Sequence, residues 1–288
     1  MGKLIWIASY PKSGNTWIRA FLHNLLMNPD EPVPLDQLTR FCHQDSDAQW
    51  FQAILDGKTE TVARYERAGG RSTAELSKEE VARLRPLSHA LMTRSHRDSV
   101  FVKTHNALVV DRGTPTVTME HTAGAIYVVR NPLDVAVSLA DHFGIPLDEA
   151  VTHLASNMET QNTDVMVYER RGNWSLHVDS WTKASHPGLH VIRYEDLKAD
   201  QENTFGALCR FLGLAPPPER LKKAIAFSTF EQLSRQEAAE GFSERSAAQE
   251  RFFRKGEAGG WRAVLTPAQA ARLAARHGAQ MARFGYSI

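Results

Sequence analysis

The chain begins with a predicted strand, a tight turn and a helix. An unbroken apolar run from Leu4 to Ala8 predicts a short buried strand. Apolar residues then recur at helical spacing from Trp17 onward, until Asn28 and Pro29 end the pattern. The segment from Ser9 to Trp17 therefore joins the carboxyl end of a strand to the first turn of a helix.

Later in the chain, short apolar runs alternate with segments of helical periodicity. The runs predicted to be strands are Val100 to Lys103, Ala125 to Val129 and Leu189 to Arg193. The segments predicted to be helices are Asp134 to His142, Asn173 to Lys183 and Asp200 to Leu212. This alternation is typical of a parallel sheet joined by right-handed crossovers. We expect an α/β fold with a central parallel β-sheet flanked by helices, in a single domain over residues 1–288.

A long insertion separates the first helix from the strand at Val100. It holds roughly seventy residues, many more than a simple crossover needs. The stretch from Ser77 to Met92 is helical in pattern and opens with the capping-box sequence Ser77-Lys78-Glu79-Glu80. We therefore expect residues from about 30 to 98 to form a helical insertion that helps to build a substrate pocket.

Composition and charge exclude several classes of partner. The 288 residues include 34 Lys and Arg against 33 Asp and Glu, so no overall charge favours nucleic acid or an anionic membrane. No apolar run reaches the length of about eighteen residues that a membrane span needs, and the start has no signal-peptide pattern. The two cysteines, Cys42 and Cys209, are too few for a disulfide framework. These features predict a cytoplasmic protein with no membrane span and no nucleic-acid partner.

The loop SYPKSGNTW, residues 9–17, has the features of an anion-binding turn at a sheet edge. Gly14 permits close approach of the backbone, Lys12 supplies charge, and the helix start presents amide groups. Side-chain donors come from Ser13, Asn15 and Thr16. The loop differs from the Walker A pattern, in which Lys directly precedes Ser or Thr. The alternative is that Pro11 and Gly14 only shape a turn and that Lys12 is solvated.

Three motifs in order resemble those of the cytosolic PAPS-dependent sulfotransferase family, where PAPS is 3'-phosphoadenosine-5'-phosphosulfate. The loop at 9–17 resembles the family's 5'-phosphosulfate loop, and IYVVRNPLDVAVSLADHF (126–143) its 3'-phosphate segment. RKGEAGGW (254–261) is similar to the family's RKGxxGDW motif. Weaker matches are VKTH (102–105), GNWSLHVDSW (172–181), YEDL (194–197) and STF (228–230). The resemblance covers most of the chain except about residues 30–98 and implies a P-loop nucleotide-kinase-like fold.

The resemblance implies a nucleotide site with two anion clamps. Arg130 ends a predicted strand and Ser138 follows in the next helix, while Arg254 offers a forked donor beside Gly256. A nucleotide with two separate anionic ends explains two separate clamps. The implied binding residues are Lys12, Ser13, Gly14, Asn15, Thr16, Trp17, Arg130, Ser138, Tyr194, Ser228, Phe230, Arg254, Lys255 and Gly256. Trp17 resembles a residue that stacks on adenine, but packing in the core is an equally open alternative, and packing is also open for Tyr194, Ser228 and Phe230.

The implied chemistry is transfer of a sulfuryl group from PAPS to a hydroxyl of a small-molecule acceptor, with 3',5'-bisphosphoadenosine (PAP) as product. His105 is the candidate general base, because imidazole titrates near neutral pH. Lys12 is expected to neutralise the leaving oxygen, and Lys103 to hold the oxygens of the transferred group. A sulfuryl group carries less charge than a phosphoryl group, and no metal-ligand cluster lies beside the loop, so no metal is expected.

Several positions depart from the family or leave alternatives open. Gly260 stands where the family motif has Asp, and Pro267 replaces a residue of the family's dimerisation motif, so the oligomeric state stays open. A small-molecule kinase and a catalytically silent nucleotide-binding module are the alternative functions. The acceptor pocket is expected from the insertion and from a mobile segment at 234–253. Its candidate side chains, Phe41, His43, Trp50 and Phe51, leave phenols, alcohols, lipids and natural products possible.

Overall fold

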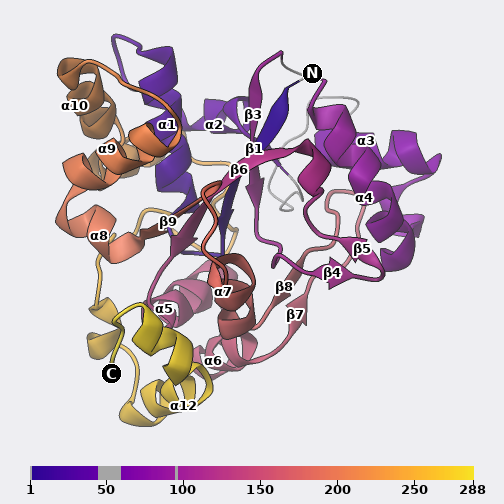
Figure 1. The fold of residues 1–288 in the computed structure, drawn as a ribbon. Coiled ribbons are helices and arrows are strands. Elements are labelled where there is room, and N and C mark those ends of the chain that lie inside the picture. The colour runs from indigo at the N-terminus through magenta and orange to yellow at the C-terminus, as the bar shows by residue number, and fades with distance from the viewer. Residues whose placement is uncertain (1, 45–59, 95–96) are drawn as a thin grey trace. The chain divides into compact units, whose positions relative to one another are not determined.

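The computed structural model describes residues 2–44, 60–94 and 97–288 (Figure 1). Within these ranges the main sheet has the strand order β2-β3-β1-β6-β9. Its strands are β1 (Lys3–Ser9), β2 (His43–Gln44), β3 (Ser99–Thr104), β6 (Thr122–Val129) and β9 (Leu189–Arg193). β1 and β3 pair in parallel, with Lys3 opposite Ser99 and Ala8 opposite Thr104. The α/β fold with a parallel sheet and flanking helices, predicted from the alternating pattern, is confirmed.

Two short ribbons and a set of helices accompany the main sheet (Figure 1). The ribbons are β4 (Val110–Asp111) with β5 (Thr114–Pro115), and β7 (Met158–Glu159) with β8 (Arg170–Gly172). The α-helices are α1 (Asn15–Met27), α2 (Leu38–Phe41), α3 (Glu60–Gly69), α4 (Lys78–Met92), α5 (Pro132–Phe143), α6 (Leu147–Ala155), α7 (Trp174–Thr182), α8 (Tyr194–Ala199), α9 (Gln201–Phe211), α10 (Pro218–Phe227), α11 (Phe230–Glu240) and α12 (Pro267–Arg283). Short 3-10 turns are η1 (Leu35–Gln37), η2 (Thr73–Glu75), η3 (Met119–His121) and η4 (Gly260–Ala263).

By its internal contacts the chain forms two compact units. The first comprises Met1–Tyr10, Cys42–Tyr127 and Thr152–Leu189. The second comprises Pro11–Phe41, Val128–Val151 and His190–Ile288. The assignment of residues 1–288 to one sulfotransferase domain stays a prediction.

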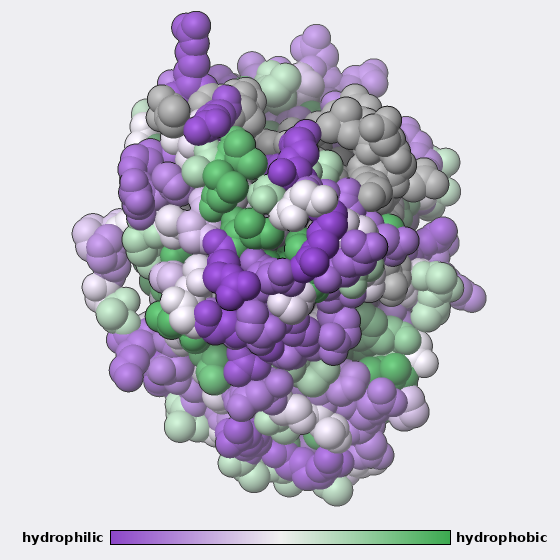
Figure 2. All heavy atoms as spheres, turned by 90° about the vertical axis from the view of Figure 1, so that its right-hand side faces the viewer, coloured by the Kyte–Doolittle hydropathy of each residue, from purple (hydrophilic) through white to green (hydrophobic). Residues whose placement is uncertain are grey.

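The first unit is built on β1, β3 and a helical pair. Trp6 of β1 is fully buried, and its indole N–H donates to Thr122 Oγ1 at 2.9 Å. The capping box expected at Ser77 is present, because Glu80 N donates to Ser77 Oγ at 3.2 Å. α3 and α4 pack together, and their buried side chains meet Val167 and Tyr168. The side that carries α3 and α4, shown in Figure 2, is mostly hydrophilic, with a hydrophobic patch in its upper half.

The second unit has α1 at its centre. The rings of Phe21 in α1 and Phe205 in α9 stack with centroids 3.8 Å apart, and α1 also packs against α10. Asn131 caps α5 by accepting from Leu133 N at 3.0 Å, and Pro132 takes the first helical position, where its missing N–H costs nothing. These local signals explain why the predicted helix at 134–142 begins two residues earlier.

Most predicted elements are confirmed within one or two residues, and the exceptions have local causes. The proline run at 216–218 separates two helices, because Pro218 is the first residue of α10. Residues 234–240, expected in a mobile segment, lie instead in α11, which Thr229 caps by accepting from Gln232 N. Trp50 and Phe51 lie outside the described residues. In the described ranges, every helix is too short or too polar to cross a membrane.

Candidate active site

The loop after β1 takes backbone conformations that favour glycine. Gly14 has φ +104° and Lys12 has φ +66°, so the chain turns sharply before α1. A Cβ atom at position 14 would lie 2.8 Å from the ring of Tyr194. Both the dihedral angle and the space therefore exclude a larger side chain at position 14, which lies against the Tyr194 ring.

Buried donors without partners lie on this loop and at Arg130, which follows β6. Among the described residues, Ser13 Oγ, Trp17 Nε1 and Arg130 Nε are buried and have no hydrogen-bond partner. A buried polar atom of this kind is costly unless a ligand or water satisfies it. The three atoms belong to residues that the sequence assigned to the nucleotide. They therefore fit a polar, anionic ligand at the start of α1.

The Lys12 ammonium lies beside two side chains that the sequence did not identify. Its Nζ atom lies 3.3 Å from His142 Nδ1 and 3.9 Å from the centre of the Phe252 ring. His142 is in the last turn of α5, and Phe252 comes two residues before Arg254. The RKG segment and α5 therefore both contribute to the surroundings of the Lys12 ammonium.

Arg130 joins the loop of Lys12 to the loop that follows Arg254. Its guanidinium donates to Lys12 O and to Glu257 O, each at 3.0 Å, and lies 4.3 Å from the centre of the Tyr194 ring. Ser138 is half-buried in α5, and no hydrogen bond links it to Arg130. The structure therefore brings Lys12, Arg130 and Tyr194 together, whereas Ser138 is not hydrogen-bonded to Arg130.

The RKG loop is anchored by a buried acid. Asp134 accepts hydrogen bonds from Gly259 N at 2.8 Å and from Trp261 N at 3.0 Å. Asp134 therefore organises the loop although Gly260 replaces the motif's Asp. Arg254 is exposed, with Nε 3.4 Å from Asp141 Oδ1, and Lys255 is also exposed.

The aromatic residues assigned to adenine have mixed surroundings. Trp17 is buried and makes edge contacts with Tyr194 at 5.8 Å and with Phe205 at 6.3 Å, as a core residue of α1 does. A Cβ at Gly256 would meet the Phe230 ring at 2.3 Å, so these two predicted residues are adjacent. Ser228 is fully buried, and its hydroxyl donates to Ala224 O at the end of α10. The Ser228 hydroxyl is therefore already used in a hydrogen bond to the backbone of α10.

A buried ion pair lies directly behind the loop. Arg19 Nη2 lies 2.7 Å from Glu244 Oε1 and also donates to Thr16 Oγ1 at 3.1 Å. The Arg19 and Glu244 side chains are 0% and 6% exposed. Thr16, which is expected to bind the donor, therefore also belongs to this cluster of Thr16, Arg19 and Glu244. Glu244 fixes the segment before the RKG motif to α1.

We expect Glu244→Ala to destabilise the protein by about 3–5 kcal/mol, because it leaves the Arg19 charge buried without its carboxylate partner. Urea denaturation measures this free energy of unfolding. The control is Asp148→Ala, which breaks an exposed pair with Arg272 and should cost about 0–1 kcal/mol. Equal losses in the two variants would contradict a structural role for the Arg19–Glu244 pair.

In the first unit, His105 follows β3 and contacts the end of β1. His105 Nδ1 lies 2.8 Å from the backbone oxygen of Ser9 and 3.4 Å from Ser9 Oγ. A carbonyl oxygen only accepts, so Nδ1 carries the proton and Nε2 keeps its lone pair. Burial lowers the pKa of His105 to about 4, so the ring is neutral at pH 7. His105 therefore has the tautomer that a general base needs.

Two further residues support His105 and its strand. His177 Nε2 lies 3.1 Å from His105 O, and His177 Nδ1 lies 2.8 Å from the Tyr127 hydroxyl. Burial lowers the pKa of His177 to about 3, so this ring is neutral as well. Lys103 is 8% exposed in β3, opposite Ile7 of β1, and lowers the pKa of His105. Sequence alone assigned no role to His177.

The lowered pKa values predict that acid destabilises the protein. His23, His105 and His177 have pKa values of about 4, 4 and 3, chiefly because they are buried. In the unfolded chain they bind protons below pH 6.5, which favours unfolding as pH falls through this value. We expect the melting temperature to drop between pH 6.5 and 5, before most carboxylates titrate. A melting temperature that is constant over this window would contradict the burial of these rings.

The chain has a parallel α/β sheet, a glycine-containing turn after its first strand and a neutral histidine after a neighbouring strand. The sulfotransferase domain family matches residues 3–285 of the chain. The chain therefore belongs to the sulfotransferase family and is an enzyme of that class, as its motifs predict. Family membership favours this hypothesis over that of a small-molecule kinase.

Individual relatives agree with this assignment. Sulfotransferase 1B1 from dog is 29% identical over 92% of this chain and 79% of its own length. Sulfotransferase 1A1 from cattle is 24% identical over 96% of this chain and 82% of its own length. A mouse sulfotransferase, SULT7A1, solved with PAP, has a TM-score of 0.60 at 20% identity over 97% of this chain and 85% of its own. Retinol dehydratase, solved with androsterone and PAP, has a TM-score of 0.64 at 17% identity. The match covers 99% of this chain and 82% of the retinol dehydratase chain. The two solved structures show the same fold.

Proposed function

We propose that this sulfotransferase moves the sulfuryl group of PAPS to the hydroxyl of a small-molecule acceptor, with His105 as general base. The observation that supports the base most strongly is the 2.8 Å contact of His105 Nδ1 with Ser9 O, which leaves the Nε2 lone pair to accept a proton. Ser9 comes three residues before Lys12 in the chain, so one short segment orients the base and carries the candidate cation.

In the proposed reaction the acceptor hydroxyl gives its proton to His105 Nε2 while its oxygen bonds to sulfur. The bond from sulfur to the bridging oxygen breaks, and its electron pair stays on the phosphate of PAP. Lys12 neutralises the charge that develops on this leaving oxygen. Lys103 holds the oxygens of the sulfuryl group, whose charge spreads in the transition state.

The donor is proposed to bind along the loop at 9–17 and the RKG loop. The unpartnered donors Ser13 Oγ and Arg130 Nε fit phosphate oxygens. Arg254 and Lys255 are exposed in the RKG loop, where they are available to an anionic group. The mouse sulfotransferase and the retinol dehydratase were both solved with PAP, in keeping with this donor.

The acceptor is proposed to be a small phenol or alcohol, and the location to be the cytoplasm. Retinol dehydratase was solved with androsterone and, separately, with retinol, which supports a small molecule as acceptor. Cys42 and Cys209 are free and buried, in keeping with a reducing compartment. Fractionation of cells that produce the protein tests the location, and recovery outside the cytoplasm would contradict it.

Incubation with sulfur-labelled PAPS and a panel of phenols, aliphatic alcohols and sterols tests the proposed reaction. We expect label in at least one product, with equimolar PAP and with activity retained in EDTA. ATP turnover that depends on magnesium, without sulfuryl transfer, would favour a kinase instead. A protein that binds PAP but transfers label to no acceptor, and whose PAP affinity and stability do not change in His105→Ala, would be a catalytically silent nucleotide-binding module.

A further inference from the structure

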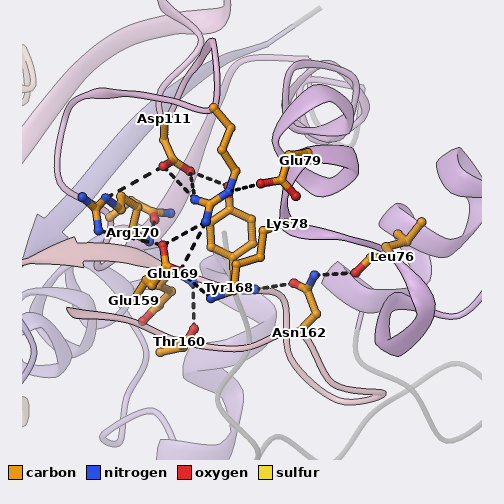
Figure 3. A network of polar contacts seen from close by, with 12 residues as sticks. Leu76, Lys78, Glu79, Asp111, Glu159, Thr160, Asn162, Tyr168, Glu169 and Arg170 are labelled. Carbon is orange, nitrogen blue, oxygen red and sulfur yellow. Dashed lines mark hydrogen bonds and ion pairs between the residues drawn. The ribbon is translucent and has the colours of Figure 1, made fainter. Parts of the chain in front are cut away.

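A buried carboxylate directly before β8 lies in a polar network of the first unit (Figure 3). Glu169 is 5% exposed and forms an ion pair with Arg171 at 2.5 Å. Its backbone is also fixed, because Glu169 N donates to Thr160 Oγ1 at 2.8 Å and Thr160 N donates to Glu169 O at 3.0 Å. Side chain and backbone together hold Glu169 in one place.

The segment that carries Glu169 is hydrogen-bonded to the segment that carries His105. Ala107 N donates to Arg170 O at 2.8 Å, and Arg170 N donates to Asn106 Oδ1 at 2.6 Å. Asn106 is itself fixed, since its N–H donates to Thr104 Oγ1 and its carbonyl accepts from the Trp181 indole. Residues 169–170 therefore lie beside residues 105–107, so the buried acid is carried on the segment that pairs with the candidate base.

The charged groups around His105 have opposite effects on its protonation. Glu169 raises the pKa of His105, whereas Lys103 and Arg171 lower it. His177 of α7 contacts the His105 backbone and is neutral, and Ser9 of β1 contributes only a carbonyl and a hydroxyl. Glu169 is thus an acid that favours the protonated form of this ring.

We propose that Glu169 is a positioning residue for the transfer, which acts by stabilising the His105 imidazolium that forms as the acceptor loses its proton. The proposal rests on the proposed role of His105 as base. In the ground state the ring is neutral and Glu169 gains little from it. When the acceptor proton reaches Nε2, the ring becomes a cation and its attraction to the carboxylate grows, so the interaction favours the transition state. Arg171 pairs with the carboxylate and holds it in place.

The neighbouring acid Glu159 provides a matched control. It lies on β7, and pairs with Lys78 at 2.5 Å and Arg112 at 3.2 Å (Figure 3). Glu159 is half-buried, and its backbone pairs with Arg170. Glu159→Gln therefore removes an acid and its ion pairs from the β7–β8 ribbon while Glu169 stays in place.

Kinetics and histidine NMR of the full chain test the proposal. We expect Glu169→Gln to lower kcat at pH 7 by about tenfold, which corresponds to roughly one pKa unit on the base, with KM for PAPS and acceptor unchanged. The titration of the labelled His105 ring should move to lower pH. Glu169→Asp should restore most of kcat, and Glu159→Gln should leave both readouts as they are. An unchanged kcat and titration in folded Glu169→Gln would overturn the proposal.

A pair of shorter variants decides the case if Glu169→Gln fails to fold. Glu169→Asp and Glu169→Asn differ only in charge, so the His105 titration should lie at lower pH in Glu169→Asn than in Glu169→Asp; equal titrations would overturn the proposal. The NMR readout needs no turnover. If His105→Ala keeps full activity while Glu169→Gln still shifts the His105 titration, His105 is not the base, but Glu169 does act on its protonation. If His105→Ala is inactive and Glu169→Gln leaves the His105 titration unchanged, His105 remains the proposed base and the role of Glu169 is refuted.

Discussion

Replacement of His105 by alanine is expected to lower kcat for sulfuryl transfer by about a thousandfold, within the range that general bases contribute. The loss follows from the tautomer of the ring, because Ser9 O binds the Nδ1 proton and Nε2 is the basic atom. Nucleotide affinity should be unchanged, since the ring is assigned to the acceptor proton and not to the donor. Turnover with labelled PAPS and calorimetry with PAP measure the two quantities separately.

The matched control for His105→Ala is His186→Ala. His186 is exposed in the loop before β9, and its ring accepts only from Gly188 N. This variant should keep full turnover. Because burial lowers the pKa of His105 to about 4, wild-type activity should also be level from pH 8 to 5 and fall as the ring protonates near pH 4. Retained turnover in His105→Ala would remove the base from the mechanism.

Lys12→Ala is expected to lower kcat by about a hundredfold to a thousandfold, the usual loss when one electrostatic contact to a developing oxyanion is removed. The ammonium lies over the Phe252 ring, in the segment before Arg254, and beside His142 of α5. Activity with a donor that has a better leaving group should suffer less, since less negative charge then needs neutralising.

Steady-state kinetics at saturating PAPS measure the effect of Lys12→Ala on the chemical step. Lys222→Ala, on the exposed side of α10, is the control for loss of a positive charge and should be neutral. A Lys12→Ala enzyme with normal kcat and a raised KM for PAPS would assign Lys12 to ground-state binding alone.

The sheet was predictable because its signals are local. The apolar runs at Leu4 to Ala8 and Leu189 to Arg193 correspond to β1 and β9. The capping box at Ser77 and the proline after Asn131 mark helix starts through contacts within three residues. Such patterns need no knowledge of the rest of the chain.

The surroundings of the site were less predictable because they depend on residues far apart in sequence. Glu244 pairs with Arg19 across 225 positions, and Phe252 reaches Lys12 from the other end of the chain. Neither residue belongs to a motif with a fixed spacing. Glu169 is one of many acids in the sequence, and only its burial beside residues 105–107 distinguishes it.

Motif residues also acquire structural roles that no local pattern indicates. Ser228 donates to its own helix, and Thr16 joins the Arg19–Glu244 cluster. Asp134, which the sequence placed only at a helix start, holds the backbone at Gly259 and Trp261. A hydroxyl or a carboxylate in a motif can therefore bind the protein itself, and its partner is visible only in the fold.

Calorimetric titration of the protein with PAP in buffer containing EDTA tests the proposed donor site most directly. We predict saturable binding at one site per chain without divalent metal, and an affinity for PAP that falls at least tenfold in Arg130→Ala. Absence of binding heat at any PAP concentration up to the millimolar range, with a folded protein, would contradict the account.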